Sequence, residues 1–212
     1  MANSTESTAR GRTPNHVRRT RTQSAILDAA ESQFVERGFA ATSIDQVAPL
    51  AHVSKGAVYF HFGSKDDLLI ALLARSQETV FKPALAILDD VNLSATDRIV
   101  SYFNRVGSLE HLNRYLLPIL TSVQGAAISA EARQRVDRLQ GLIHASLVAA
   151  IRGGLTAGEF HSPLRPVELA SLVQALMDGM LLQWHRNSGE IRGPEFLRAG
   201  RHALFGALGV AA

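Results

Sequence analysis

Apolar residues recur at helical spacing along nearly the whole chain, and this periodicity constrains the fold more than any other feature of the sequence. One face of the segment 129–152, for example, carries Val136, Leu139, Ile143, Leu147 and Ile151. No segment alternates apolar and polar residues in the way that a half-buried strand requires. The sequence therefore predicts an all-α protein of about nine helices.

Capping residues, glycines and prolines mark where the helices begin and end. We expect helices from Thr22 to about Gly38, Thr42 to Leu50, Ser54 to about Gly63, Lys65 to about Leu88, Ser94 to about His111, Asn113 to Gln124, Ser129 to about Arg152, Pro166 to about Asn187, and Gly193 to about Leu208. Thr42, followed three residues later by Asp45, resembles a capping box. Pro83 interrupts the fourth helix, and residues 153–163 are expected to form a loop.

The net charge of +3 arises entirely in the first third of the chain. Residues 1–65 carry eight Lys and Arg residues against five Asp and Glu residues, whereas the other 14 basic and 14 acidic residues cancel. This asymmetry favours a polyanionic partner for the N-terminal part. The absence of cysteine excludes disulfides and cysteine-ligated metals, and no apolar run is long enough to span a membrane, so we expect a cytoplasmic protein.

The chain divides into three parts by composition and helix length. Residues 1–20 are rich in Ser, Thr, Asn and Arg and are expected to form a disordered basic tail. Residues 21–66 hold three expected helices, and a tight turn joins the last two, at about residues 43–62. That pattern is typical of a helix-turn-helix DNA-binding domain, although ordinary three-helix packing also produces it. Residues 67–212 are expected to form a larger helical domain.

The residues of this N-terminal part resemble the TetR-type transcriptional repressor family. The resemblance spans residues 22–69 and rests on Ile26–Ala30, Phe34, Gly38-Phe39, Ala41-Thr42, Val53–Phe62 and Ser64–Leu68. It implies that residues 67–212 form an effector-binding and dimerisation domain. It further implies a ligand-responsive repressor, a homodimer that binds a palindromic double-stranded DNA operator and is released by a small, largely apolar effector.

The chemistry of the matching residues fits DNA binding. Lys55 and Lys65 can neutralise phosphates, Gly56 lets the third helix approach the groove closely, and Ser54 and Ala57 can contact bases. The expected DNA-binding residues are Thr42, Ser43, Ser54, Lys55, Gly56, Ala57, Tyr59, His61 and Lys65. The alternative is a helical adaptor that uses the same motif to contact another protein.

Two residues of the turn depart from the family pattern. His52 stands where the family usually has glycine, at a position expected to need a positive φ angle. Pro49 falls inside the second helix and removes an amide hydrogen, so we expect that helix to be bent or short.

The larger domain is expected to provide a dimer interface and an effector site. The last two helices are expected to pair with their copies in a second subunit, through Leu172, Leu176, Met180, Leu197, Gly200, Leu204 and Leu208. Packing within one subunit is the alternative for these residues. The candidate effector-binding residues are Tyr102, Phe103, Tyr115, Gln124, His144, Asp178 and Trp184.

Nothing in the sequence favours catalysis. The histidines are scattered and form no metal-binding pair on one helix face, and no nucleophile elbow, phosphate loop or dinucleotide-binding motif is present. We therefore expect a protein that is not an enzyme and has no catalytic residues, no metal and no cofactor.

Overall fold

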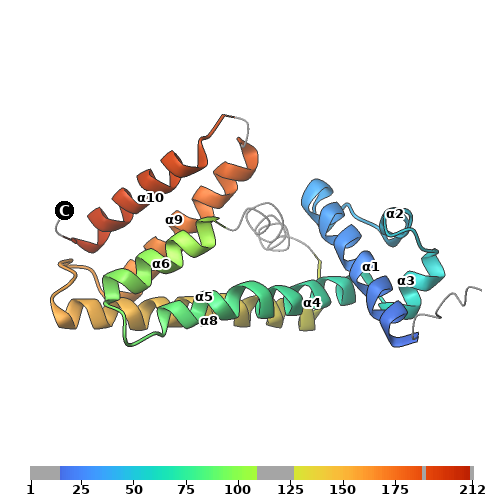
Figure 1. Ribbon diagram of the computed structural model, residues 1–212, viewed down its shortest axis with the longest axis horizontal. Coiled ribbons are helices and arrows are strands. Elements are labelled where there is room, and N and C mark those ends of the chain that lie inside the picture. Colours follow the sequence, from blue (N-terminus) through green and yellow to red (C-terminus); the bar gives the residue numbers. More distant parts are fainter. Residues whose placement is uncertain (1–14, 109–126, 188–189, 211–212) are drawn as a thin grey trace, which may run out of the picture.

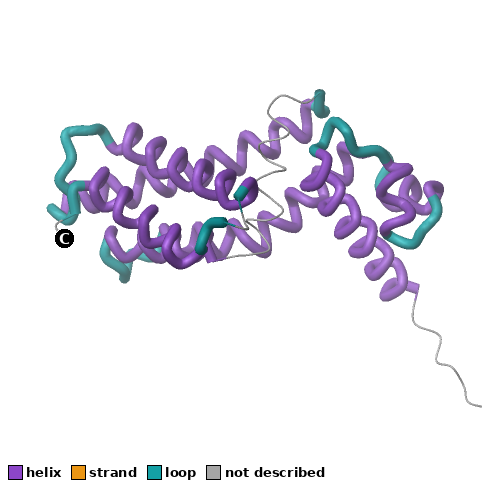
Figure 2. Tube along the Cα trace, turned by 90° about the horizontal axis from the view of Figure 1, so that it is seen from above, coloured by secondary structure: helices purple, strands orange, loops and turns teal. Residues whose placement is uncertain are grey.

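The computed structural model describes residues 15–108, 127–187 and 190–210, and it contains only helices and loops in those ranges (Figures 1 and 2). The prediction of an all-α fold is therefore confirmed. The molecule is elongated, with a small group of helices at one end, which we call the head, and a larger group at the other, which we call the body (Figure 1). None of the helices in the described ranges is both long and apolar enough to cross a membrane.

The head consists of α1 (Asn15–Arg37), α2 (Ile44–Leu50), α3 (Lys55–His61) and the first turns of α4 (Lys65–Ser76). Helix α1 begins at Asn15, well before the expected Thr22. The expected boundary of the tail is thus corrected, because Arg18 and Arg19 lie on a helix. The segment around them has no proline or glycine after Pro14 that would stop the helix from extending.

Helix α2 is capped one residue later than the sequence suggested. Ser43 is the N-cap, and its backbone amide donates to the Gln46 side chain at 2.8 Å. The Thr42 side chain is instead buried, with 3% of its surface exposed, and its hydroxyl lies 3.0 Å from the Gln33 carbonyl and 2.9 Å from the Gly38 carbonyl. Thr42 therefore fastens the end of α1 to the loop before α2.

The turn between α2 and α3 has the strained geometry that the sequence predicts. His52 has a φ of 55° and is the single non-glycine residue with positive φ in the described part of the chain. Helix α2 ends just after Pro49, whose carbonyl accepts the His52 amide at 3.0 Å. Ser54 then starts α3, since its hydroxyl accepts the Ala57 amide at 3.1 Å.

One long helical segment connects the head to the body. It comprises α4, a π-helical turn η1 (Gln77–Phe81) and α5 (Lys82–Leu88), which follow one another without a break (Figure 1). Pro83 lies in the first turn of α5, where it has no amide hydrogen to donate to the preceding turn. The wider turn of η1 just before it explains how the chain stays helical through the proline.

The body contains α6 (Ala95–Ser108), α8 (Ala130–Ala157), α9 (Pro166–Arg186) and α10 (Gly193–Leu208). The helix expected from Asn113 to Gln124 lies outside the described residues. Helix α8 continues through Gly153 and Gly154, which were expected in a loop, and ends at Gly158 with a φ of 74°. Gly154 is needed inside the helix because a Cβ there would collide with the Phe160 ring.

Two hydrophobic cores hold the head and the body. The head core packs α1, α2, α3 and α4 together around fully buried residues such as Phe34, Val47, Val58 and Leu69. Ala132 and Val136 from α8 join the same core, so a helix of the body reaches into the head. The body core forms between α5, α6, α8, α9 and α10.

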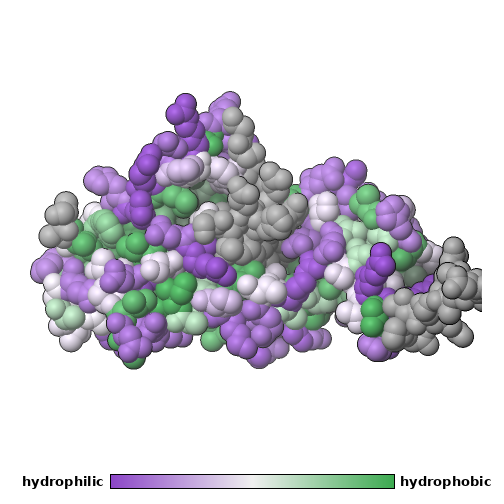
Figure 3. Space-filling view, viewed as in Figure 1, coloured by the Kyte–Doolittle hydropathy of each residue, from purple (hydrophilic) through white to green (hydrophobic). Residues whose placement is uncertain are grey.

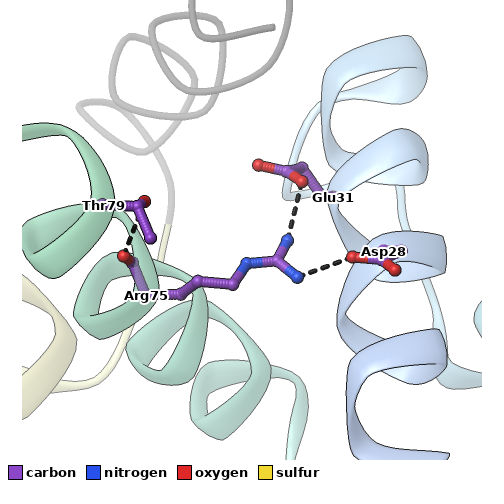
Figure 4. Close-up of polar contacts among 4 residues, drawn as sticks. All are labelled: Asp28, Glu31, Arg75 and Thr79. Atoms are coloured by element: carbon purple, nitrogen blue, oxygen red, sulfur yellow. Dashed lines mark hydrogen bonds and ion pairs between the residues drawn. The ribbon is translucent and has the colours of Figure 1, made fainter. Parts of the chain in front are cut away.

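Polar contacts reinforce the junction between the two parts. Arg75 on α4 reaches α1, where its guanidinium lies 2.6 Å from Asp28 and 2.7 Å from Glu31 (Figure 4). The Ser129 amide, at the start of α8, donates to Asp66 on α4 at 2.7 Å. These contacts attach α1 to the connecting helix α4, and α4 to the start of α8 in the body.

The turn strain gives a first prediction. We expect His52→Gly to keep or raise the free energy of unfolding and His52→Val to lower it by about 1 kcal/mol or more, because branched side chains tolerate positive φ poorly. Urea denaturation followed by circular dichroism measures both. If the valine variant were as stable as the glycine variant, the positive φ at residue 52 would not strain the backbone.

Candidate nucleic-acid interface and helical cavity

Helix α3 has one buried face and one exposed face. Val58 is 0% exposed and anchors the helix in the head core, whereas Ser54, Lys55, Gly56 and Tyr59 are exposed. The structure thus brings the expected base-contacting residues together at the N-terminal end of one short helix, with Ala57 half-buried beside them. An exposed helix of this kind presents its first residues to a groove.

No neighbour in the described part of the chain requires glycine at position 56. A Cβ at this position would meet nothing closer than the Ser54 hydroxyl at 3.9 Å, and the backbone is ordinary helix. Glycine inside a helix costs about 1 kcal/mol relative to alanine. The space beside Gly56 is therefore open toward the outside of the molecule.

Lys55 is paired in the free protein. Its ammonium lies 2.7 Å from the Asp45 carboxylate on α2, and this hydrogen bond raises the pKa of Lys55. Both side chains are exposed, so solvent weakens the pair and a phosphate or a base can replace Asp45 as the partner.

Lys65 has an internal role that the sequence did not indicate. Its Nζ donates to the carbonyls of Phe39, Ala40 and Thr42 at 2.7, 3.3 and 2.9 Å, and it lies 4.4 Å from the centre of the Phe39 ring. Partial burial lowers the pKa of this ammonium, which Asp66 opposes. Lys65 thus closes the loop between α1 and α2. A phosphate must displace one of these carbonyls to bind Lys65, and that contact stays a prediction.

The other expected DNA contacts differ in accessibility. Ser43 is exposed at the start of α2, whereas the Thr42 side chain is buried and its hydroxyl bonds to backbone carbonyls, so a phosphate contact by Thr42 stays a prediction that would require this bond to break. His61 is half-buried at the end of α3, and its buried Nδ1 has no hydrogen-bond partner among the described residues.

The sequence did not single out Phe60 and Arg19 as a pair. Phe60 is 75% exposed on α3, and the Arg19 guanidinium of α1 lies 6.0 Å from its ring centre. Arg18 and Arg21 are exposed on the same part of α1. Arg19 can lie beside Phe60 because α1 begins at Asn15, earlier than the sequence predicted.

The body contains an apolar cavity of about 320 Å³ between α6, α9 and α10. Its described lining includes Phe103, Met177, Met180, Trp184, Phe196 and Leu197. Of the candidate effector residues, Phe103 and Trp184 line this cavity. Tyr102 is buried in the body core, where burial raises its pKa, and His144 and Asp178 are not part of the lining. Tyr115 and Gln124 lie outside the described residues.

Helices α9 and α10 also carry an exposed face of small and apolar residues. On α9 it contains Leu172, Ala175 and Gly179, and on α10 it contains Ala199, Ala203 and Gly206. A Cβ at Gly179 or at Gly206 would meet nothing within 4 Å. These two glycines, like Gly56, have no partner inside the described protein that requires them. Hydrophobic residues also interrupt the hydrophilic surface elsewhere on the body (Figure 3).

Comparison with known proteins decides the family. Residues 26–72 match the model of bacterial regulatory proteins of the tetR family, and residues 119–208 match the C-terminal domain of BetI-type transcriptional repressors. The HTH-type transcriptional regulator TtgR of Pseudomonas putida is 30% identical over 178 residues, which cover 82% of this chain and 83% of that protein. This chain belongs to the TetR family. It is a DNA-binding transcriptional repressor and not an enzyme.

Other TetR-family proteins agree in sequence and fold. The HTH-type transcriptional repressor BepR of Brucella suis is 25% identical over 169 residues, covering 77% of this chain and 80% of BepR. The crystal structure of the MbdR regulator from Azoarcus sp. CIB superposes with a TM-score of 0.78 at 28% identity, covering 88% of this chain and 98% of that one. The structure of NalD, the secondary repressor of a multidrug efflux pump in Pseudomonas aeruginosa, shares the TetR fold, with a TM-score of 0.72 at 22% identity and coverage of 90% and 98%.

Several residues expected at a TetR dimer interface lie inside the subunit instead. Gly200, Leu204 and Leu208 are buried in the body core, and a Cβ at Gly200 would collide with Met180 and Phe103. Leu176, Met180 and Leu197 are half-buried against the same core. Gly200, Leu204 and Leu208 therefore pack within one subunit, which was the alternative interpretation, whereas a dimer contact through Leu176, Met180 and Leu197 stays a prediction. Leu172, which is 47% exposed, remains available to a second subunit.

The internal role of Lys65 gives a second prediction. We expect Lys65→Met to lower the free energy of unfolding by about 1 to 3 kcal/mol, because three carbonyls lose a charged donor. Lys82→Met removes the same charge from an exposed pair with Glu78 and is the control, expected to stay within about 0.5 kcal/mol of the parent. Equal stability of the two variants in urea denaturation would show that Lys65 does not hold the loop.

Proposed function

We propose that this TetR-family protein is a cytoplasmic homodimeric repressor that holds a palindromic operator and releases it when a small, largely apolar effector binds the body. Residues 21–66, extended to the start of α1, form the DNA-binding domain, and the rest forms the effector-binding and dimerisation domain. The observation that carries the DNA-binding role is the exposed start of α3, where Gly56 is open to the outside and the neighbouring side chains can form hydrogen bonds.

Helix α3 enters the major groove with its first turn. Ser54, Lys55 and Ala57 contact base edges, and Gly56 allows the helix backbone to come close to the bases. The phosphates are contacted by Ser43 at the start of α2 and by Tyr59 and His61 on α3. Lys65 contacts a phosphate when the phosphate replaces one of the three backbone carbonyls that its ammonium binds. Arg18, Arg19 and Arg21 extend the basic surface beside α3.

Dimerisation proceeds through the exposed face of α9 and α10. Small residues allow two helices to approach closely, which accounts for Gly179 and Gly206 where the subunit itself needs no glycine. A two-fold pair of subunits presents two copies of α3, and two copies read two half-sites of an inverted repeat.

The effector acts on the long segment α4–η1–α5, which connects the body to the head. The head core includes residues of α4 and α8, so a shift of either helix moves α3. The effector weakens DNA binding only if it prefers the conformation that does not fit the operator.

The test of this function is selection of duplexes from a random pool with the purified protein. An enriched inverted repeat is expected, with affinity that falls steeply as salt is added, because phosphate contacts release counterions. An adaptor that contacts proteins is the alternative. It would enrich no duplex, and binding that is insensitive to salt would also contradict the proposal.

The Lys55–Asp45 pair gives a third prediction. Asp45→Asn is expected to tighten binding to the selected duplex by about threefold or more, because it frees Lys55 and removes a negative charge near the phosphates. Asp89→Asn makes the same change on an exposed residue of the body and should leave the affinity unchanged. Fluorescence anisotropy with a labelled duplex compares them, and no gain for Asp45→Asn would argue against Lys55 as a DNA contact.

The exposed face gives a fourth prediction. Gly179→Glu together with Gly206→Glu should raise the dissociation constant of the dimer by about tenfold or more, since like charges would meet across the two-fold axis. Gly141→Glu is the matched control, because Gly141 is also exposed on a helix with nothing near its Cβ position. Sedimentation velocity measures the subunit association. If the double variant dimerised like the control, the interface would lie elsewhere.

A further inference from the structure

The described residues that line the cavity in the body have apolar side chains almost throughout. It lies between α6, α9 and α10, has a volume of about 320 Å³, and is lined by aromatic rings from Phe103, Trp184 and Phe196 and by the thioethers of Met177 and Met180. None of the described lining residues carries a charge or a hydroxyl group. Pockets for small molecules span roughly 300 to 1,000 Å³, so this one is at the small end of the range.

Two glycines fix the shape of this cavity. A Cβ at Gly193 would lie 2.9 Å from the Trp184 ring, and one at Gly107 would collide with the Leu197 side chain. Glycine at both positions lets Trp184 and Leu197 pack against the backbone of a neighbouring helix while they line the cavity. The side chains of Trp184 and Leu197 are therefore held in place by close packing against the backbone at these glycines, as expected for a preformed site.

The lining selects a ligand by charge and by shape. An ionised group buried there finds no counter-charge on the described walls, and burial of an unpaired charge is strongly unfavourable. Flat aromatic rings gain from stacking against aromatic walls and from contact with methionine sulfur. We propose that the cavity binds an uncharged aromatic molecule of one to three rings, in contact with Trp184.

This inference rests on the proposed function only in treating that molecule as the effector. The lining residues on α9 lie on the side of the helix opposite to Leu172, Ala175 and Gly179, so on α9 the cavity wall and the proposed dimer face are formed by different residues. The cavity lies in the body and α3 lies in the head, so ligand binding and DNA binding can be measured separately.

The test uses two probes with the same ring skeleton. N-phenyl-1-naphthylamine is uncharged, and 8-anilinonaphthalene-1-sulfonate differs from it by one sulfonate. The purified full-length protein is expected to bind the uncharged probe about tenfold or more tightly than the anionic one. Trp184 is the only tryptophan in the chain, so its emission should be quenched as the uncharged probe binds. Equal affinity for the two probes would overturn the proposal.

Cavity-filling variants locate the site. Val106→Phe, on α6, and Leu181→Phe, on α9, each fill the cavity from a different wall and should weaken binding of the uncharged probe about tenfold or more. Val148→Phe makes the same change at a half-buried valine outside the cavity and should leave binding unchanged. Circular dichroism verifies that each variant is folded. If one of the two cavity-filling variants fails to fold, the other provides the test.

Two further outcomes separate the site from the function. Retained binding in a folded filling variant would overturn the cavity as the site. Tight binding of the probe that leaves the affinity for the selected duplex unchanged would support the ligand site and contradict its role in operator release.

Discussion

The position of the seven-residue helix α3 depends on its packing in the head core. Helices as short as α2 and α3 are not stable alone in water, so their geometry comes from the core that they share with α1, α4 and α8. Val58 anchors α3 in that core, while Lys55, Gly56, Tyr59 and Phe60 of the same helix stay exposed. Lys65 adds a polar constraint, because it ties the loop before α2 to the first turn of α4.

The same core makes the head responsive to the body. Helix α4 contributes Leu68, Leu69 and Leu72 to the head core and continues through η1 into α5, and α8 contributes to both cores. Arg75 fixes α1 to α4 through two carboxylates (Figure 4). A rearrangement in the body that moves α4 or α8 therefore acts on the core that holds α3, which is the physical basis of the proposed regulation.

Much of the head could be predicted from the sequence because its signals are local. The Ser54 cap follows from neighbouring residues, the positive φ of His52 was implied by the family resemblance, and the structure confirms both. The bonds of Lys65 could not be predicted, because they join residues 23 to 26 positions apart. In the body, periodicity identified Gly200, Leu204 and Leu208 as apolar contacts but could not tell which surface they meet, and they proved to face their own core. The exposed glycines Gly179 and Gly206 could be recognised only once the neighbouring side chains were placed.

The central claim is that α3 reads the bases of DNA, and a change of sequence preference tests it most directly. Duplex selection with Ala57→Gln should give a half-site that differs from the parent's at about one or two base pairs, with the spacing of the half-sites unchanged, because glutamine adds a donor and an acceptor at the groove. If the variant bound DNA and enriched the same half-site as the parent, α3 would not be the reading helix.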